Sequence, residues 1–72
     1  MAARPPRLEN HRFVGDKRSQ VVYDLDDPLL DQAIVHELMQ SGQIVVFAPD
    51  TLPEARNRSY RLSKAQRHRA EG

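Results

Sequence analysis

The predicted fold depends most on residues 27–48, DPLLDQAIVHELMQSGQIVVFA. Asp27 can accept hydrogen bonds from the free amides at the start of a helix, and Pro28 suits the first helical position, where no amide donor is needed. Gly42 can adopt the left-handed conformation that ends many helices. These signals predict a helix over residues 28–41.

The apolar residues of this stretch change their spacing at the glycine. Before it, Leu30, Ile34 and Leu38 recur every four residues, and with Ala33 they form one apolar face of the helix. After it, residues 44–48 (IVVFA) are continuously apolar and are bounded by a glycine and a proline. A short run of this kind predicts a strand buried on both faces, which we expect to be the central strand of a sheet.

A β-hairpin is predicted before this unit, over residues 11–25. The polar run that follows Gly15 is a turn signal. Beyond it, Val21, Tyr23 and Leu25 would share one face of a strand under the two-residue period. The hairpin would therefore supply two further strands.

A short helix is predicted after the buried strand, over residues 52–58. Thr51 and Glu54 have the spacing of a capping box, in which each side chain bonds the other residue's backbone amide. The helix is expected to bury Leu52 and Ala55.

These elements make one small α+β domain, residues 11–62, between two polar segments. Residues 1–10 are expected to form a flexible arm, and residues 63–72 a flexible basic tail or a helix that forms only on a partner. One modest core is expected, made of Phe13, Val21, Tyr23, Leu25, Leu30, Ile34, Leu38, Ile44, Val46, Phe47, Leu52 and Tyr60. A chain of 72 residues without cysteine has neither a large core nor a disulfide. Contacts with a larger partner are therefore expected to add stability.

The charges of the chain are strongly segregated. Residues 1–20 carry five basic and two acidic residues, residues 21–54 carry seven acidic residues and no Lys or Arg, and residues 55–72 carry six basic residues and one acidic residue. The basic ends can fold over the acidic middle, or they can bind an external acidic surface. The sequence leaves both arrangements open.

Arginines of the two ends are the candidate partner-binding residues. They are Arg4, Arg7, Arg12, Arg56, Arg58, Arg61, Arg67 and Arg69. The preferred partner is an acidic surface of a larger protein. Nucleic acid is the alternative, in which these arginines would neutralise phosphates and Tyr60 would stack on a base. The acidic middle would repel nucleic acid, however, and Tyr60 is well placed to close the core.

Three motifs with catalytic precedents lack the residues that catalysis needs. Asp24 and Asp26 follow an apolar strand, as in haloacid-dehalogenase-type phosphatases, but those enzymes also need a lysine, further carboxylates and a larger sheet. His36 and Glu37 begin a zinc-protease pattern whose second histidine is replaced by Gln40. No serine lies in a nucleophile elbow. We therefore expect no enzyme activity, no metal and no cofactor.

Five short motifs occur in an order that is similar to that of one family. They are Phe13-Val14-Gly15-Asp16-Lys17-Arg18-Ser19, Val22-Tyr23, Phe47, Glu54-Ala55 and Ser59-Tyr60-Arg61. Over about residues 13–66, this order resembles the small metal-binding domain at the start of the Ada-type DNA-repair methyltransferases. The resemblance implies a turn, strand, helix, strand and short helix in the same sequence.

This chain departs from that family at the metal site. The family binds zinc through cysteines, and the resemblance places Asp27 and Pro28 near the first pair and Ser63 and Gln66 at the second. Without thiolates, neither zinc binding of that type nor the methyl-accepting chemistry carries over. The resemblance therefore implies only the fold, as a cysteine-free scaffold held by its apolar core or by a partner.

The sequence thus predicts a non-catalytic accessory or small subunit that binds a larger protein, with a small nucleic-acid-binding module as the alternative. No stretch approaches the roughly 20 apolar residues needed to cross a bilayer. The first residues also lack the apolar region of a secretory signal. We expect a cytoplasmic protein with neither a membrane nor a small-molecule partner.

Overall fold

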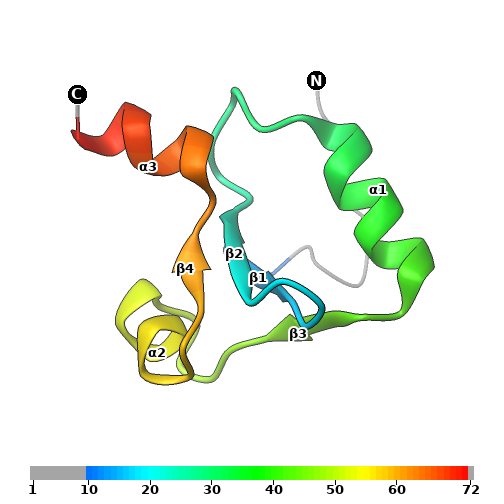
Figure 1. The fold of residues 1–72 in the computed structure, drawn as a ribbon, viewed down its shortest axis with the longest axis horizontal. Coiled ribbons are helices and arrows are strands. Elements are labelled where there is room, and N and C mark those ends of the chain that lie inside the picture. Colours follow the sequence, from blue (N-terminus) through cyan, green and yellow to red (C-terminus); the bar gives the residue numbers. More distant parts are fainter. Residues whose placement is uncertain (1–9, 72) are drawn as a thin grey trace.

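The computed structural model describes residues 10–71, which form a mixed four-stranded sheet and three helices (Figure 1). The elements are β1 (Phe13–Asp16), β2 (Val21–Asp24), α1 (Gln32–Ser41), β3 (Ile44–Val46), α2 (Leu52–Asn57), β4 (Arg61–Leu62) and α3 (Lys64–Glu71). This is the α+β class that the sequence predicts. The predicted N-terminal arm, apart from Asn10, lies outside the described residues.

The central strands of the sheet are β1 and β2, in the order β3-β1-β2-β4. They form the predicted antiparallel hairpin, with Val14 opposite Tyr23. The turn closes through the Asp16 carbonyl, which accepts hydrogen bonds from the N–H groups of Ser19 (3.3 Å) and Gln20 (2.8 Å). β3 pairs with β1 antiparallel, and β4 pairs with β2 in parallel. The hairpin prediction is therefore confirmed.

The prediction that residues 44–48 form the central strand is wrong. Among the described strands, β3 lies at an edge and pairs only with β1. Ile44 and Val45 pack into clusters on opposite faces of the sheet, whereas Val46 is 41% exposed. No residue of β3 is fully buried, so the predicted burial on both faces is met only in part. A strand at the edge can contact apolar clusters on both faces and still expose part of its apolar run.

Helix α1 begins four residues later than predicted. Asp27 does not cap it. Its Oδ1 instead accepts the N–H two residues later at 2.9 Å, and its carbonyl accepts the Leu30 N–H at 3.1 Å, which makes a separate turn. The cap is Asp31, whose Oδ1 accepts the Ala33 N–H at 2.9 Å. The predicted end is confirmed, because Gly42 is left-handed with a φ of 72°.

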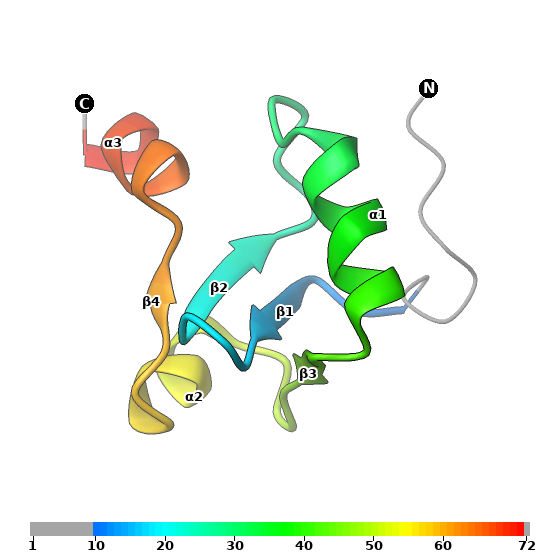
Figure 2. The same ribbon diagram turned by 45° about the vertical axis from the view of Figure 1, so that its right-hand side comes forward.

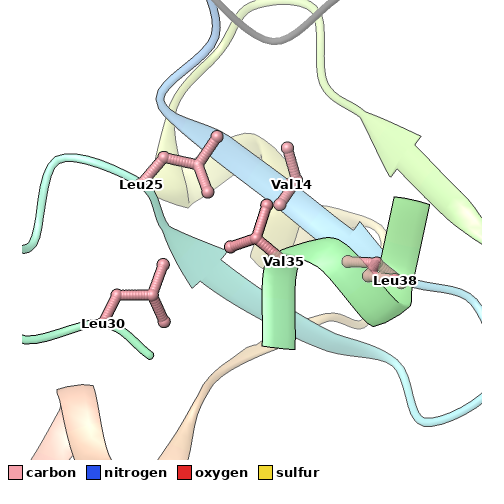
Figure 3. Close-up of a cluster of buried hydrophobic side chains, with 5 residues drawn as sticks. All are labelled: Val14, Leu25, Leu30, Val35 and Leu38. Atoms are coloured by element: carbon pink, nitrogen blue, oxygen red, sulfur yellow. The ribbon is translucent and has the colours of Figure 1, made fainter. Parts of the chain in front are cut away.

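Apolar side chains form two clusters, one on each face of the sheet, rather than a single core. Figure 3 shows the cluster under α1, made of Val14, Leu25, Leu30, Val35 and Leu38. The cluster under α2 is made of Phe13, Val22, Phe47 and Ala55. Neighbouring strand residues belong to opposite clusters, as the two-residue period requires. The sheet is therefore the middle of three layers, with α1 and α2 outside it (Figures 1 and 2).

Two residues of the predicted core are exposed, and Val46 is one of them. The other is Ile34, which is 38% exposed, while Val35 and Leu38 make the inner face of α1. The late start of the helix explains this difference. Leu30 is buried before the helix begins, so the four-residue spacing counted from it does not define the buried face.

Both ends of α2 are closed by hydrogen bonds. Thr51 caps the helix as predicted, because its Oγ1 accepts the Glu54 N–H at 3.3 Å. The Glu54 carboxylate instead accepts a bond from Arg58 Nε at 2.8 Å. At the other end, Ser59 is left-handed with a φ of 69°, and the Tyr60 N–H bonds the carbonyl five residues earlier. This Schellman pattern leads the chain directly into β4.

Helix α3 lies in the segment for which the sequence predicts a tail or a helix that forms only on a partner. Gln66 holds it against the sheet: its Oε1 accepts the Asp24 N–H at 3.0 Å, and its Nε2 donates to the Asp24 carbonyl at 2.9 Å. Gln66 is 4% exposed, so these bonds are shielded from water. The helix is therefore formed and attached in the chain alone. Across residues 10–71, no helix is both long and apolar enough to cross a membrane.

Candidate functional site

A groove with a volume of about 590 Å³ lies beside β4, and its walls come from α2, β4 and α3. It is lined by Leu52, Arg56, Ser59, Tyr60, Arg61, Leu62 and Arg67. In Figures 1 and 2, α2 lies at one end of β4 and α3 at the other. We call this surface the basic groove.

The apolar part of the basic groove continues the core cluster under α2. Leu52, Tyr60 and Leu62 are partly buried against that cluster and also line the groove. Leu52 lies four residues before Arg56, so the two share one face of α2. Helix α2 therefore places Arg56 beside apolar side chains that are already partly buried.

The basic part of the groove lacks internal counter-charges. Among the described side chains, the guanidinium groups of Arg56, Arg61 and Arg67 form no ion pair and no hydrogen bond, and all three residues are exposed. No Asp or Glu is among the described residues that line the groove. The three guanidinium groups therefore concentrate positive charge in one concave surface.

The other described arginines are neutralised within the fold. Arg12 lies 3.0 Å from the Asp24 carboxylate, and this hydrogen bond is the main cause that raises the pKa of Arg12. Arg18 pairs with Asp16 at 3.0 Å and with Glu37 at 2.8 Å. The positive charges of Arg12 and Arg18 are therefore neutralised by carboxylates of the same chain.

The structure separates the eight arginines that the sequence selects. Three of them, Arg56, Arg61 and Arg67, meet in the basic groove. Arg12 and Arg58 are paired internally, Arg58 with the Glu54 carboxylate at 2.8 Å. Arg4 and Arg7 lie outside the described residues, and Arg69 lies in α3 without a described side chain.

The apolar lining of the groove is what sequence reasoning missed. Leu52 and Leu62 belong to it, but only Leu52 carried a sequence signal, its four-residue spacing from Arg56 on the predicted helix. Leu62 has no such signal, because its place depends on the pairing of β4 with β2.

A second, acidic pocket of about 380 Å³ is lined by the end of β2 and the segment that follows it, together with one residue each of β4 and α3. Asp24, Asp26 and Asp27 line it together with Arg12 and Gln66. Arg12 also lies 3.6 Å from the Asp26 carboxylate, so the aspartates of the phosphatase-like motif are engaged in structural bonds. Among the described residues, no group of three His, Asp or Glu side chains is arranged to hold a metal ion.

Residues at the positions that the resemblance assigns to zinc ligands lie near one another. Asp27, Pro28 and Gln66 line the acidic pocket, and the Ser63 hydroxyl donates to Gln66 Oε1 at 2.9 Å. Gln66 also bonds the backbone of Asp24, as described above. At these positions the chain therefore has a hydrogen-bond network between α3 and β2.

The zinc-protease-like pattern lies on the exposed side of α1. His36 and Gln40 are four residues apart, and their side-chain nitrogens are 3.1 Å from each other. Glu37, between them in sequence, binds Arg18. These residues stabilise the surface of the helix.

No protein-family model, curated protein or solved structure matches the chain. The resemblance to the Ada-type domain therefore stays a prediction. The chemistry of the basic groove is the basis for a functional proposal.

Proposed function

We propose that this protein is a non-catalytic binding subunit that docks on a larger protein by holding an acidic segment of it in the basic groove. The observation that carries the proposal is the difference between two sets of arginines. Arg12, Arg18 and Arg58 each pair with a carboxylate of the fold, whereas the three groove arginines have none among the described residues.

An acidic segment would supply the counter-charges that the groove lacks. Guanidinium groups bind carboxylates through short, charge-assisted hydrogen bonds, often two at a time. Such pairs gain strength when water is partly excluded, and the concave shape of the groove favours that exclusion. Charge complementarity of this kind contributes mainly to specificity and to the rate of association.

An apolar residue of the same segment would provide the second part of the affinity. Leu52, Tyr60 and Leu62 are partly buried in the chain alone, so a side chain placed on them would complete the cluster under α2. Each square ångström of apolar surface removed from water contributes about 25 cal/mol. The ligand that fits best therefore combines carboxylates with at least one aliphatic or aromatic side chain.

Docking also agrees with the size of the core. Two small clusters, each with four or five buried residues, support a chain that has no disulfide. Ligands that bind only the folded state stabilise it by mass action. A partner in the groove would bridge α2, β4 and α3 and so tie the C-terminal elements together.

Nucleic acid fits the groove less well than an acidic protein segment does. The Tyr60 ring packs edge-on against Phe47, with ring centroids 5.3 Å apart, and it also lies against Gly15. A tyrosine committed to the core in this way is a poor stacking platform for a base.

The test compares groove variants with a variant of equal charge change elsewhere. Arg61→Glu and Arg56→Glu alter the groove, and Lys17→Glu is the matched control because Lys17 is exposed in the hairpin turn. The probes are a fluorescent peptide of alternating glutamate and valine and a fluorescent single-stranded oligonucleotide of the same net charge.

We expect the wild-type chain and Lys17→Glu to bind the peptide, and each groove variant to lose at least tenfold in affinity. In a nuclease-treated lysate, the groove variants should also lose any protein that the wild type and the control retain in stoichiometric amount. Tighter binding of the oligonucleotide than of the peptide would overturn the proposal in favour of the nucleic-acid module.

A further inference from the structure

The backbone of β4 has one hydrogen-bonding side turned away from the sheet. The Arg61 N–H donates to the Gln20 carbonyl at 3.0 Å, and the Ser63 N–H donates to the Val22 carbonyl at 2.9 Å. Backbone groups of successive strand residues point to opposite sides. The N–H and C=O of Leu62 therefore point away from β2.

No strand of the described chain lies on that outer side. β4 is the last strand in the order β3-β1-β2-β4, and in both ribbon views no other strand lies on its outer side (Figures 1 and 2). Arg61 and Leu62, which are the whole of β4, also line the basic groove. An open backbone edge and an uncompensated positive surface thus occur at the same place.

We propose that the acidic segment binds as a fifth strand, by pairing its backbone with the outer edge of β4. This inference rests on the proposed function and specifies the conformation of the partner. An extended segment that adds to a sheet edge gains affinity from main-chain hydrogen bonds and specificity from alternate side chains. Here the main-chain bonds would be made to Leu62.

The alternation of a strand fits the composition of the groove. Side chains of successive residues point to opposite faces, so alternate residues of the added strand would lie over the face that α2 covers. On that face, Leu52 and Tyr60 would contact an apolar side chain. Carboxylates on the intervening residues would point to the other face, as Arg61 does, and would neutralise its guanidinium group. The preferred ligand is therefore an extended segment in which apolar and acidic residues alternate.

A second copy of this chain is a poor occupant of the same edge. Pairing two β4 strands would bring the arginines of one groove against those of the other, and like charges placed opposite each other destabilise a sheet. The second sheet edge lacks the chemistry of the first: β3 is made only of Ile44, Val45 and Val46. The open edge of β4 thus selects an acidic partner over self-association.

The experiment uses the alternating glutamate–valine peptide in three forms. One is unmodified, one carries N-methyl groups on every second residue, and one carries them on the other residues. Only one of the two N-methyl sets removes donors that face β4, so the other set is an internal control for the effect of N-methylation itself. Affinity is measured by fluorescence anisotropy, and hydrogen exchange of the Leu62 amide is measured by NMR.

We expect one N-methylated form to lose at least tenfold in affinity while the other binds within about threefold of the unmodified peptide. The exchange of the Leu62 amide should slow at least tenfold when the unmodified peptide is bound. If both N-methylated forms bind like the unmodified peptide and Leu62 exchanges unchanged, strand addition is overturned. In that case the proposed function still stands, provided that Arg61→Glu abolishes binding. If no form of the peptide binds to the folded chain, the proposed function fails as well.

Discussion

The ring of Tyr60 lies directly on the backbone of Gly15. A Cβ atom at Gly15 would be 2.7 Å from Tyr60 Cε2 and 2.8 Å from Val45 Cγ1, closer than side-chain carbons approach each other. Because Gly15 has no side chain, the ring of Tyr60, which follows α2, can pack directly against β1. The contact joins the hairpin at the start of the domain to the segment that leads into the basic groove.

Gly15→Ala is expected to destabilise the chain by about 1–3 kcal/mol, because the added methyl group overpacks this contact. Urea denaturation followed by circular dichroism measures the change. In a Tyr60→Ala background the same substitution should cost less, because two of the three closest atoms belong to the Tyr60 ring. An equal cost in both backgrounds would contradict the proposed cause.

Gln66→Leu is expected to destabilise the chain by about 1–3 kcal/mol and to release α3. The substitution keeps a similar volume but leaves the Asp24 N–H without its partner, and an unpaired polar group shielded from water carries a cost of this size. The Asp24 carbonyl loses its bond to Gln66 but still accepts the Asp27 N–H at 3.2 Å. Hydrogen exchange at the Asp24 amide should accelerate. Gln43→Leu is the control, because Gln43 is exposed, and it should leave both stability and exchange nearly unchanged.

Ser59→Gly is expected to stabilise the chain by about 1 kcal/mol. Ser59 has a φ of 69°, and a side chain in the left-handed region costs about this amount relative to glycine. Ser59→Val should shift stability in the opposite direction, because a branched Cβ tolerates this conformation least. Thermal unfolding of the two variants beside the wild type separates the predictions. A lower melting temperature for Ser59→Gly would show that the serine hydroxyl has a role of its own.

Stability should fall at acid pH through Asp16. Its hydrogen bond to the Arg18 side chain lowers the pKa of Asp16 in the folded state, so the folded chain binds a proton more weakly than the unfolded chain does. The stabilisation is therefore complete above the unfolded pKa of about 4 and is lost as the pH falls through the folded value. The difference in unfolding free energy between the wild type and Asp16→Asn should shrink from pH 6 to pH 2. A difference that stays constant over this range would refute the assignment.

Signals that act within a few residues predicted the structure well. Gly42 ends α1 and Thr51 caps α2, because each depends on backbone groups only a few residues away. The predicted start of α1 is wrong because Asp27 and Asp31 are four residues apart and offer the same capping carboxylate, so local signals do not choose between them. Burial of Leu30 in the cluster under α1 favours the second, and that burial depends on strands elsewhere in the chain.

The groove was only partly predictable, because it depends on contacts between distant segments. The sequence identifies Arg56, Arg61 and Arg67 as candidates, but their meeting in one groove depends on the pairing of β4 with β2. Arg58 is different, because its four-residue spacing from Glu54 on the predicted helix is a local signal of an ion pair. Gln66 had no role in the prediction beyond the resemblance, yet its amide bonds to Asp24 hold α3 in place. Hydrogen bonds between residues 42 positions apart leave no periodic pattern in the sequence.

The parallel pairing of β2 with β4 joins strands from opposite ends of the described chain, whereas the β1–β2 hairpin closes over a short turn. Bringing distant segments together carries a larger entropic cost, so we expect the β4 edge to be completed after the hairpin. The basic groove is then absent from a nascent, truncated or partly unfolded chain. A protein that binds there would therefore recognise only chains in which β4 is already paired with β2.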